Sequence, residues 1–173
     1  SVGEWQAVSI GLDNTYLEQT HTPYHYLSSK LVKQLQRPLP KFAHKGTKGH
    51  VLVMGGSYGK IGACVMAAQA CLQIGAGLCT AHLPTCGYNI MQTNLPEVMT
   101  LCDPEHACLS QLPEDLSRYQ AIAVGTGIGT AMLTQQFIEK LLEQKIPLVI
   151  DADALNIIAQ NQWQDRLCPN SIL

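Results

Sequence analysis

The sequence carries little charge, few aromatic side chains and no long apolar run. Charged residues make up 14% of its 173 residues and aromatic residues 6%, and the net charge is -2. Without a basic block, the chain lacks the phosphate-neutralising face of a nucleic-acid-binding protein. No apolar run approaches the roughly 18 residues that cross a bilayer, and no signal-peptide pattern follows Ser1. We therefore expect neither a nucleic-acid nor a membrane partner, and a cytoplasmic location.

A disulfide framework also lacks support, because the seven cysteines are odd in number and form no C-x-x-C pair. Cys64 and Cys71 fall in a predicted helix and Cys79 in a predicted strand, so we interpret them as small apolar core residues in a reducing compartment. His21 and His25 are four residues apart, but the proline between them disfavours a helix that would present both to a metal ion. We predict no metal site from these residues.

Composition changes along the chain. Hydrophobic residues make up 46% of the whole, enough for one folded domain with a core. Residues 1–43 are more polar, contain three prolines and show little apolar periodicity, so we predict a linker or arm there. Within it, 27–36 is predicted as a short helix capped by Ser28 or Ser29. Residues 44–173 are predicted to fold.

From residue 50 onward, strand and helix patterns alternate. Apolar runs predict strands at 51–54, 77–83, 98–101, 121–124 and 147–150, and periodicity predicts helices at 61–74, 86–92, 113–117, 131–144 and 154–160. Strand, turn and helix in repetition are typical of parallel strands joined by helical crossovers. The strands are apolar throughout, as expected when helices cover both faces. The sequence therefore predicts an α/β fold with a mostly parallel sheet flanked by helices on both faces.

Three turns follow predicted strands and carry unusual chemistry, at 55–62, 125–129 and 151–156. Ligands of parallel sheets bind at the carboxyl ends of the strands, so these turns are the candidate site. In the first turn, glycines let a ligand approach the backbone closely, and the following helix directs its positive end at an anion. Its spacing, Gly56-x-x-Gly59-x-x-Gly62, fits neither the dinucleotide fingerprint nor the phosphate-binding P-loop. A tight turn that only packs a helix closely is the alternative.

The second turn, Gly-Thr-Gly-Ile-Gly at 125–129, is a weak signal alone but could line the same cleft. The alternative is that its threonine, Thr126, or the next one, Thr130, only caps the following helix. In the third turn, helix capping would explain Asp153. It would not explain Asp151, whose charge follows an apolar strand and could bind a hydroxyl or hydrated Mg²⁺.

Seven short motifs in order resemble the NAD(P)H-hydrate dehydratase domain of the ribokinase-like superfamily. They are HKG at 44–46, HVLVMGGS at 50–57, GA at 62–63, GAGL at 75–78, PEVM at 96–99, GTGIG at 125–129 and DADALN at 151–156. The resemblance covers about residues 44–173. The stretch SIGLD at 9–13 resembles the tail of the epimerase domain that precedes the dehydratase in bifunctional repair enzymes.

The resemblance implies an enzyme that repairs NADH or NADPH damaged by hydration. Such enzymes use ADP or ATP, with Mg²⁺, to phosphorylate the added hydroxyl, and phosphate then leaves. Carried onto matching positions, it implies that Ala63, Gly125, Gly127 and Gly129 contact the hydrated dinucleotide. The same resemblance implies that Gly55, Gly56 and Ser57 shape this cleft. Asp151, a candidate catalytic residue, together with Asp153 and Asn156 would line the region of phosphoryl transfer.

The sequence departs from the family's pattern in two places. Gly-Thr-Gly stands where the family usually has Gly-Pro-Gly. The family's Thr-Pro-His-Pro-Gly-Glu stretch and its Gly-Ser/Thr-Gly-Asp turn, which supplies the catalytic base, do not occur. We therefore expect the chain to be the front portion of a longer domain, with the base beyond Leu173. The family also implies a homo-oligomer, usually a tetramer.

Two other functions fit the same residues. A ribokinase-like kinase acting on a small alcohol would also use the glycine turns and Asp151, and it would release a stable phosphorylated product. A catalytically incomplete dinucleotide-binding or assembly module would bind NAD(P)H hydrate without turnover. The DADALN motif and the Lys45-Gly46 pair favour the dehydratase.

Overall fold

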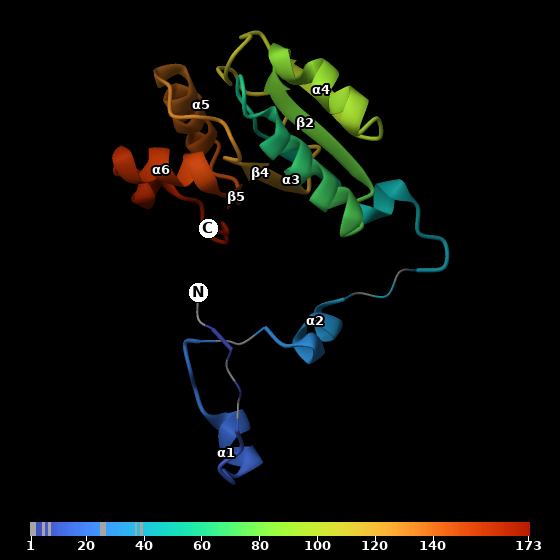
Figure 1. Cartoon of the computed structure of the whole chain (residues 1–173), viewed down its shortest axis with the longest axis vertical. Helices are drawn as coiled ribbons and strands as arrows, with labels where there is room; N and C mark the ends of the chain where they lie inside the picture. The colour runs from blue at the N-terminus through green and yellow to red at the C-terminus, as the bar shows by residue number, and fades with distance from the viewer. Residues whose placement is uncertain (1–2, 5, 7, 25–26, 37, 39) are drawn as a thin grey trace. The chain divides into compact units, whose positions relative to one another are not determined.

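The computed structural model describes residues 3–4, 6, 8–24, 27–36, 38 and 40–173; His25 lies outside these ranges. It divides the chain into two units, residues 1–40 and 41–173. The first unit contains α1 (Asn14–Gln19) and α2 (Ser29–Leu35), drawn in blue in Figure 1. Ser28 accepts a hydrogen bond from the Leu31 N–H and caps α2, as predicted. The assignment of residues 1–43 as a linker or arm stays a prediction.

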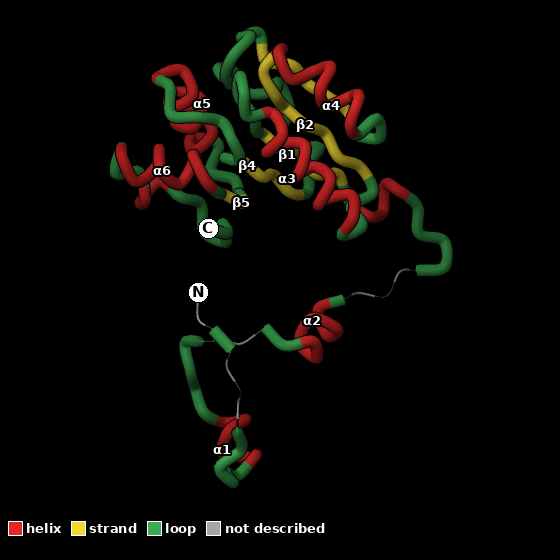
Figure 2. The backbone as a smooth tube through the Cα atoms, viewed as in Figure 1, coloured by secondary structure: helices red, strands yellow, loops and turns green. Residues whose placement is uncertain are grey.

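The second unit is built on one parallel sheet of five strands (Figure 2). The strands are β1 (His50–Met54), β2 (Leu78–Pro84), β3 (Met99–Asp103), β4 (Ala121–Val124) and β5 (Val149–Ile150). Their order in the sheet is β3-β2-β1-β4-β5, and every neighbouring pair is parallel. The chain therefore builds outward from β1 in one direction and then crosses back to build outward in the other. The predicted α/β fold with a parallel sheet is confirmed.

Helices cover both faces of this sheet. They are α3 (Ile61–Gln73), α4 (Tyr88–Asn94), α5 (Met132–Glu143) and α6 (Ala152–Gln160), with 3-10 turns at Lys45–Lys48, Thr85–Gly87 and Gln164–Arg166. Within β1, Val53 packs with residues of α3 and α4, whereas Leu52 and Met54 pack with residues of α5 and α6. Figure 1 shows the two helix pairs on separate sides of the strands. Both faces of a central strand are thus buried, which explains its unbroken apolar sequence.

Element predictions were largely confirmed. Helix α3 ends where predicted, because Gly75 takes a φ of 105°, which stops the helix. The predicted helix at 113–117 was wrong. There the Asp115 side chain accepts hydrogen bonds from the N–H and the hydroxyl of Ser117, at 2.8 and 2.7 Å. This local side-chain turn competes with helical hydrogen bonding, so a non-helical segment forms instead.

No described helix connects β3 to β4. Residues 104–120 instead lie across the face shared with α5, where Leu109 is fully buried and Tyr119 nearly so.

His50 lies at the amino end of this face. Its Nε2 lies 2.7 Å from the Thr80 hydroxyl, and its ring makes an edge contact with Tyr119 at 4.7 Å between centroids. His50 therefore has the hydrogen-bonded structural role that a histidine at a strand end favours.

The sheet continues beyond β5. Ile172 pairs in parallel with Val149, and its N–H donates to Leu148 O at 2.8 Å.

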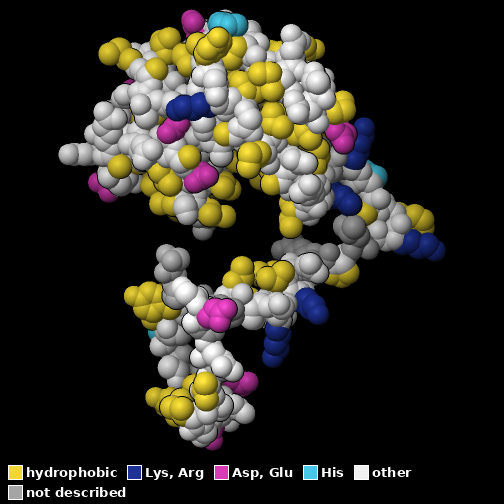
Figure 3. Space-filling view, viewed as in Figure 1, with side chains coloured by type: hydrophobic (Ala, Val, Ile, Leu, Met, Phe, Trp, Pro, Cys, Tyr) yellow, Lys and Arg dark blue, Asp and Glu magenta, His cyan; other side chains and the backbone are white. Residues whose placement is uncertain are grey.

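Acidic and basic side chains are dispersed among uncharged ones on the face of residues 41–173 seen in Figure 3. Among the helices that the structure describes, none is long and apolar enough to cross a membrane.

Candidate functional site

The candidate site lies where the strand order changes direction, between β1 and β4. The last residues of β1, β4 and β5 are aligned with one another in the sheet. The residues that follow them, Gly55, Gly125 and Asp151, therefore lie side by side at the carboxyl edge. A crevice opens at this position in doubly wound sheets because the connections on its two sides run in opposite directions. The predicted turns thus meet at the one edge where parallel sheets bind ligands.

Hydrogen bonds join the first two turns directly. The Gly56 N–H donates to Thr126 O at 2.8 Å, and the Ser57 hydroxyl donates to Gly127 O at 2.7 Å. Ser57 is only 9% exposed, so its hydroxyl is committed to this bond. Gly56 has a φ of 81°, which other residues rarely adopt, so glycine is needed to direct its N–H across the crevice. Ser57 therefore positions the second turn rather than facing solvent.

The second turn packs against the start of α3. A Cβ on Gly127 would come within 2.8 Å of Lys60 O and 3.0 Å of the Ala63 Cβ. The structure thus brings the predicted residues Ala63 and Gly127 into contact. Within the described part of the chain, the Gly127 N–H donates no hydrogen bond. It is therefore available to a ligand.

The beginning of α3 offers further donors. Its N-cap, Lys60, makes no side-chain capping bond, so the first N–H groups of the helix lack a side-chain acceptor. Gly62 and Gly59 border open space, since a Cβ at either would meet no atom within 4 Å. The Ala63 N–H donates to Lys60 O at 3.2 Å, which leaves the N–H groups before it. N–H groups at a helix start, beside open space, favour an anion such as phosphate. The predicted anion-binding role of the first turn is consistent with this geometry.

Asp153 joins the second turn to α6. Its Oδ2 accepts a hydrogen bond from the Gly129 N–H at 2.8 Å and lies 3.6 Å from Lys60 Nζ. The interpretation of Asp153 as a helix cap was wrong, because the N-cap of α6 is Asp151 and Asp153 lies inside the first turn. The Gly129 N–H is already committed to Asp153, so it is not a free donor for a ligand. Lys60 is more than half exposed and adds a positive charge beside this edge.

Asp151 is held by its backbone and presents its side chain to solvent. Its N–H donates to Val124 O at 3.0 Å, and its carbonyl oxygen lies so close to Gly125 that no Cβ would fit there. The side chain makes no capping bond to α6. Ala152 has a φ of 48°, an unusual value for a non-glycine residue that is frequent at functional sites. The exposed Asp151 carboxylate therefore has no described partner in the fold.

Other predicted residues differ in their surroundings. Asn156 lies exposed one turn further along α6, and the structure shows no polar contact of its side chain with described residues. Neither Thr126 nor Thr130 caps α5, whose N-cap is Ala131 without a side-chain bond. The alternative interpretation, in which one of these threonines caps α5, was therefore wrong. Thr126 instead contributes its carbonyl oxygen to Gly56.

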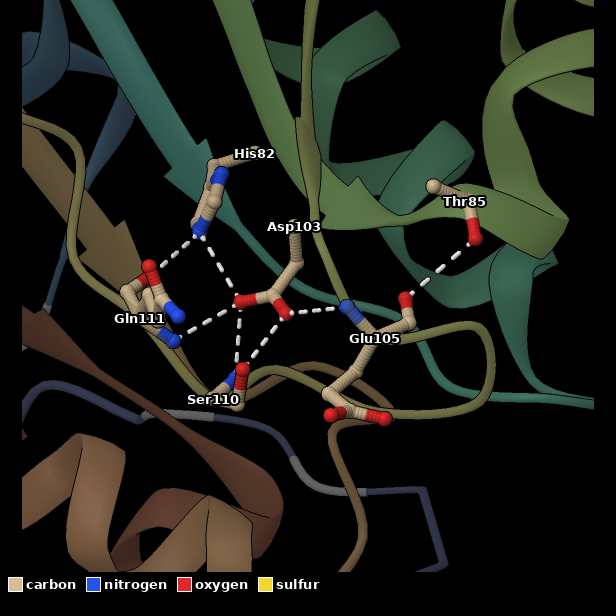
Figure 4. Close-up of polar contacts among 6 residues, drawn as sticks. All are labelled: His82, Thr85, Asp103, Glu105, Ser110 and Gln111. Carbon is tan, nitrogen blue, oxygen red and sulfur yellow. Dashed lines mark hydrogen bonds and ion pairs between the residues drawn. The ribbon is translucent and has the colours of Figure 1, made fainter.

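Sequence reasoning missed a third side of the edge, the segment after β3. The Tyr58 N–H donates to Ala107 O at 2.8 Å, which joins the first turn to this segment. The segment is held by Asp103, whose side chain is fully buried. Figure 4 shows the backbone N–H groups of Glu105, Ser110 and Gln111 converging on its carboxylate, at 2.7 to 2.9 Å. No sequence periodicity predicts that an aspartate will anchor a loop in this way. The only signal in the sequence was a single Asp at a strand end.

The charge state of this cluster follows from its contacts. Burial alone would raise the pKa of Asp103, but the donors from Ser110, Gln111 and Glu105 together hold that pKa below its ordinary value. The His82 ring beside it places Nε2 2.9 Å from Gln111 O. Burial lowers the pKa of His82, so its ring is neutral near pH 7. Asp103 is therefore an ionised anchor satisfied by backbone N–H groups rather than by a positive charge.

Cys64, Cys71 and Cys79 have the core positions expected of them. Cys64 and Cys79 are buried in the core under α3, and Cys71 is half-buried beside them. Burial raises the pKa of Cys64 and of Cys79 to about 12. These thiols are therefore uncharged and unreactive at neutral pH, as the core interpretation requires.

Comparison with known proteins identifies the family. Residues 51–173 match the sequence profile of the NAD(P)H-hydrate dehydratase family. The chain is 35% identical over 167 residues to the bifunctional NAD(P)H-hydrate repair enzyme Nnr of Coxiella burnetii, a match that covers 94% of this chain and 33% of that protein. The chain thus spans about a third of the length of this relative.

Solved structures agree with the fold. A ribokinase-like superfamily protein from Enterococcus faecalis V583 superposes with a TM-score of 0.69 at 24% identity, covering 82% of this chain and 52% of that one. The ADP/ATP-dependent NAD(P)H-hydrate dehydratase from Bacillus subtilis, co-crystallised with ATP/Mg²⁺, gives a TM-score of 0.62 at 26% identity, covering 74% and 46%. The fold is ribokinase-like, and the chain belongs to the NAD(P)H-hydrate dehydratase family.

Proposed function

We propose that the protein restores NADH and NADPH from their hydrates, using ADP or ATP as phosphoryl donor. Phosphorylation converts the added hydroxyl from a poor leaving group into phosphate, a good one. Departure of phosphate, with loss of a proton from the ring, then regenerates the ring double bond. The observation that carries this proposal is the convergence of two glycine turns and Asp151 at one sheet edge, in a chain of this family.

The first role of this edge would be to bind the dinucleotide. The open start of α3 and the Gly127 N–H would receive its phosphate groups, with Lys60 adding positive charge. Asp153 would not bind the ligand directly through Oδ2, since that atom holds the Gly129 N–H. It would instead keep the second turn in its binding shape. Pre-formed donors of this kind lose little entropy when a ligand arrives.

The exposed Asp151 carboxylate would serve the phosphoryl-transfer step. Mg²⁺ typically binds one or two carboxylates together with substrate phosphates, and Asp151 offers a carboxylate that the fold does not use. Asp151 therefore fits a role in holding Mg²⁺, which when bound would offset the negative charge on the transferring phosphoryl group. Asp153 differs, because its Oδ2 already accepts the Gly129 N–H.

The test is restoration of reduced nicotinamide by the full-length protein. Purified NADH hydrate is incubated with the protein, Mg²⁺ and either ADP or ATP, and absorbance of the reduced ring is followed. We expect recovery that requires a nucleotide and is lost in Asp151→Asn. A stable phosphorylated hydrate without recovery of NADH would instead assign a kinase. Hydrate binding without any turnover would assign a binding module.

A further inference from the structure

Tyr58 stands at the rim of the candidate site with its ring exposed to solvent. It follows Ser57, which is bonded to Gly127, and its side chain is 72% exposed. An aromatic ring buries much apolar surface when it is covered, so an exposed ring on a fixed backbone is poised to gain contact area from a ligand. The ring centroid lies 6.1 Å from that of His106, with 46° between the two planes. Two ring systems therefore border the first glycine turn.

The backbone under both rings is fixed. The Tyr58 N–H donates to Ala107 O, and the Cys86 N–H donates to His106 O at 3.2 Å. The hydroxyl of Thr85 lies 3.4 Å from His106 Nδ1 and orients the imidazole ring. The same threonine donates its N–H to Glu105 O at 3.1 Å. The segment that carries His106 is thus attached at successive residues to Thr85 and Cys86, just after β2, and the turn that carries Tyr58 is joined to it through Ala107.

Asp103 provides the anchor below this segment. Its carboxylate gathers backbone N–H groups on both sides of His106, from Glu105 and from Ser110 and Gln111 (Figure 4). A buried carboxylate satisfied in this way makes an alternative loop path costly, because each N–H would lose a charge-assisted bond. Asp103 therefore fixes the segment that carries His106, and the Tyr58 N–H bond to Ala107 O joins the first turn to that segment.

We propose that Tyr58 and His106 form a stacking platform for a heterocyclic ring of the bound dinucleotide. The inference rests on the proposed function, because it needs a dinucleotide whose phosphates bind at the start of α3. Such a ligand has a ring on either side of its pyrophosphate, so a site that holds the phosphates brings a ring within reach of the adjoining rim. The platform supplies apolar contact, while the glycine turns supply N–H donors.

Direct binding of NADH, the product of the proposed reaction, tests the platform without requiring turnover. Full-length wild type, Tyr58→Ala, Tyr58→Phe and His106→Ala are titrated with NADH, and its fluorescence gives the dissociation constant. Stacking of a base on an aromatic side chain changes affinity by about fivefold to 150-fold on alanine substitution. We expect Tyr58→Ala to weaken binding at least about fivefold and Tyr58→Phe to stay within about twofold. His106→Ala should fall between them.

Phe42→Ala is the matched control, since Phe42 is 85% exposed but precedes the amino end of β1. It should leave the affinity unchanged. Circular dichroism melts establish that each variant is folded, as expected for exposed rings. Equal affinity of wild type and Tyr58→Ala for NADH would overturn the platform, and so would an equal loss in Phe42→Ala or failure of the wild type to bind NADH.

Further arms identify the ring and separate this inference from the proposed function. Competition by AMP and by reduced nicotinamide mononucleotide is measured in wild type and Tyr58→Ala, and the fragment whose affinity falls carries the stacked ring. A loss confined to ATP, with NADH unaffected, would overturn the assignment to the dinucleotide. In turnover assays the Tyr58→Ala effect should appear in KM rather than kcat. Absence of turnover with intact, Tyr58-dependent NADH binding would reject the proposed activity and retain the platform.

Discussion

The Asp153 carboxylate holds the backbone N–H of Gly129 at 2.8 Å across 24 positions of sequence. This bond ties the turn after β4 to the first turn of α6, and the same oxygen lies 3.6 Å from Lys60 Nζ at the start of α3. One side chain therefore connects three elements around the crevice. We therefore expect the shape of the site to depend on it.

Asp153→Ala should loosen the second turn. A hydrogen bond to a charged acceptor contributes about 1.5 to 3 kcal/mol, and Asp153 is partly exposed, so we expect a loss of about 1 to 2 kcal/mol in the free energy of unfolding. Dinucleotide affinity should fall about tenfold, because the turn would have to be ordered on binding. Urea unfolding and NADH titration measure the two effects. Asp165→Ala, an exposed aspartate outside the site, is the control, and an unchanged affinity in Asp153→Ala would contradict this role.

Gly62→Ala separates packing from ligand contact. Its Cβ would point into open space within a helix, so stability should rise by up to about 1 kcal/mol. If phosphate approaches the start of α3, the added methyl group obstructs it, and NADH affinity should fall severalfold. Thermal unfolding and titration on the same sample give both numbers. Tighter or equal binding by the alanine variant would show that the ligand does not approach this surface.

Gly125→Ala should disrupt the fold itself. The residue has a φ of 129°, and a Cβ there would collide with Asp151 O and come within 2.9 Å of the Ala154 Cβ. We expect a loss of about 3 kcal/mol or more in the free energy of unfolding. Gly59→Ala is the matched control, with a φ of 81° but open space around it, and should cost only about 1 kcal/mol. Similar losses in the two variants would show that strain, and not the collision, dominates.

Acid should weaken the domain partly through Asp103. Because the folded pKa of this carboxyl is held below its ordinary value of 3.8, its contribution to stability is present above that value and is lost as pH falls through the folded pKa. In Asp103→Asn, we expect a loss of about 3 kcal/mol at pH 7 and a shallower decline of stability below about pH 4. Urea unfolding across a pH series measures both. Parallel curves for wild type and variant would exclude Asp103 as the titrating group.

The glycine turns could be placed from sequence because each follows an apolar run and precedes a helical period. Those local signals locate strand ends, and the family resemblance added which strand ends belong together. The true role of Asp153 was hidden, since the same position in sequence is compatible with a helix cap. Only the strand order, which brings Gly129 beside α6, distinguishes the two roles. A hydrogen bond between two elements far apart in the chain leaves no periodicity or spacing in the sequence that would predict it.

The segment after β3 escaped prediction for a different reason. Its ordering comes from one buried carboxylate and several backbone N–H groups, and backbone groups leave no trace in the side-chain pattern. The helix predicted at 113–117 failed there as well, because Asp115 and Ser117 form a local turn. Tyr58 was overlooked because a single aromatic residue in a turn does not predict a binding role until its neighbours in space are known.

The strand order has a consequence for how the protein acquires function. Ser57 and Gly127 meet across 70 positions of sequence, with three strands (β2, β3 and β4) and two α-helices (α3 and α4) folded between them. Closing so long a loop is slow relative to forming local structure, so we expect the crevice to be completed late in folding. A partly folded chain would have helices and strand pairs but no binding site. A dinucleotide that binds only the completed crevice would then stabilise the fully folded state relative to partly folded ones.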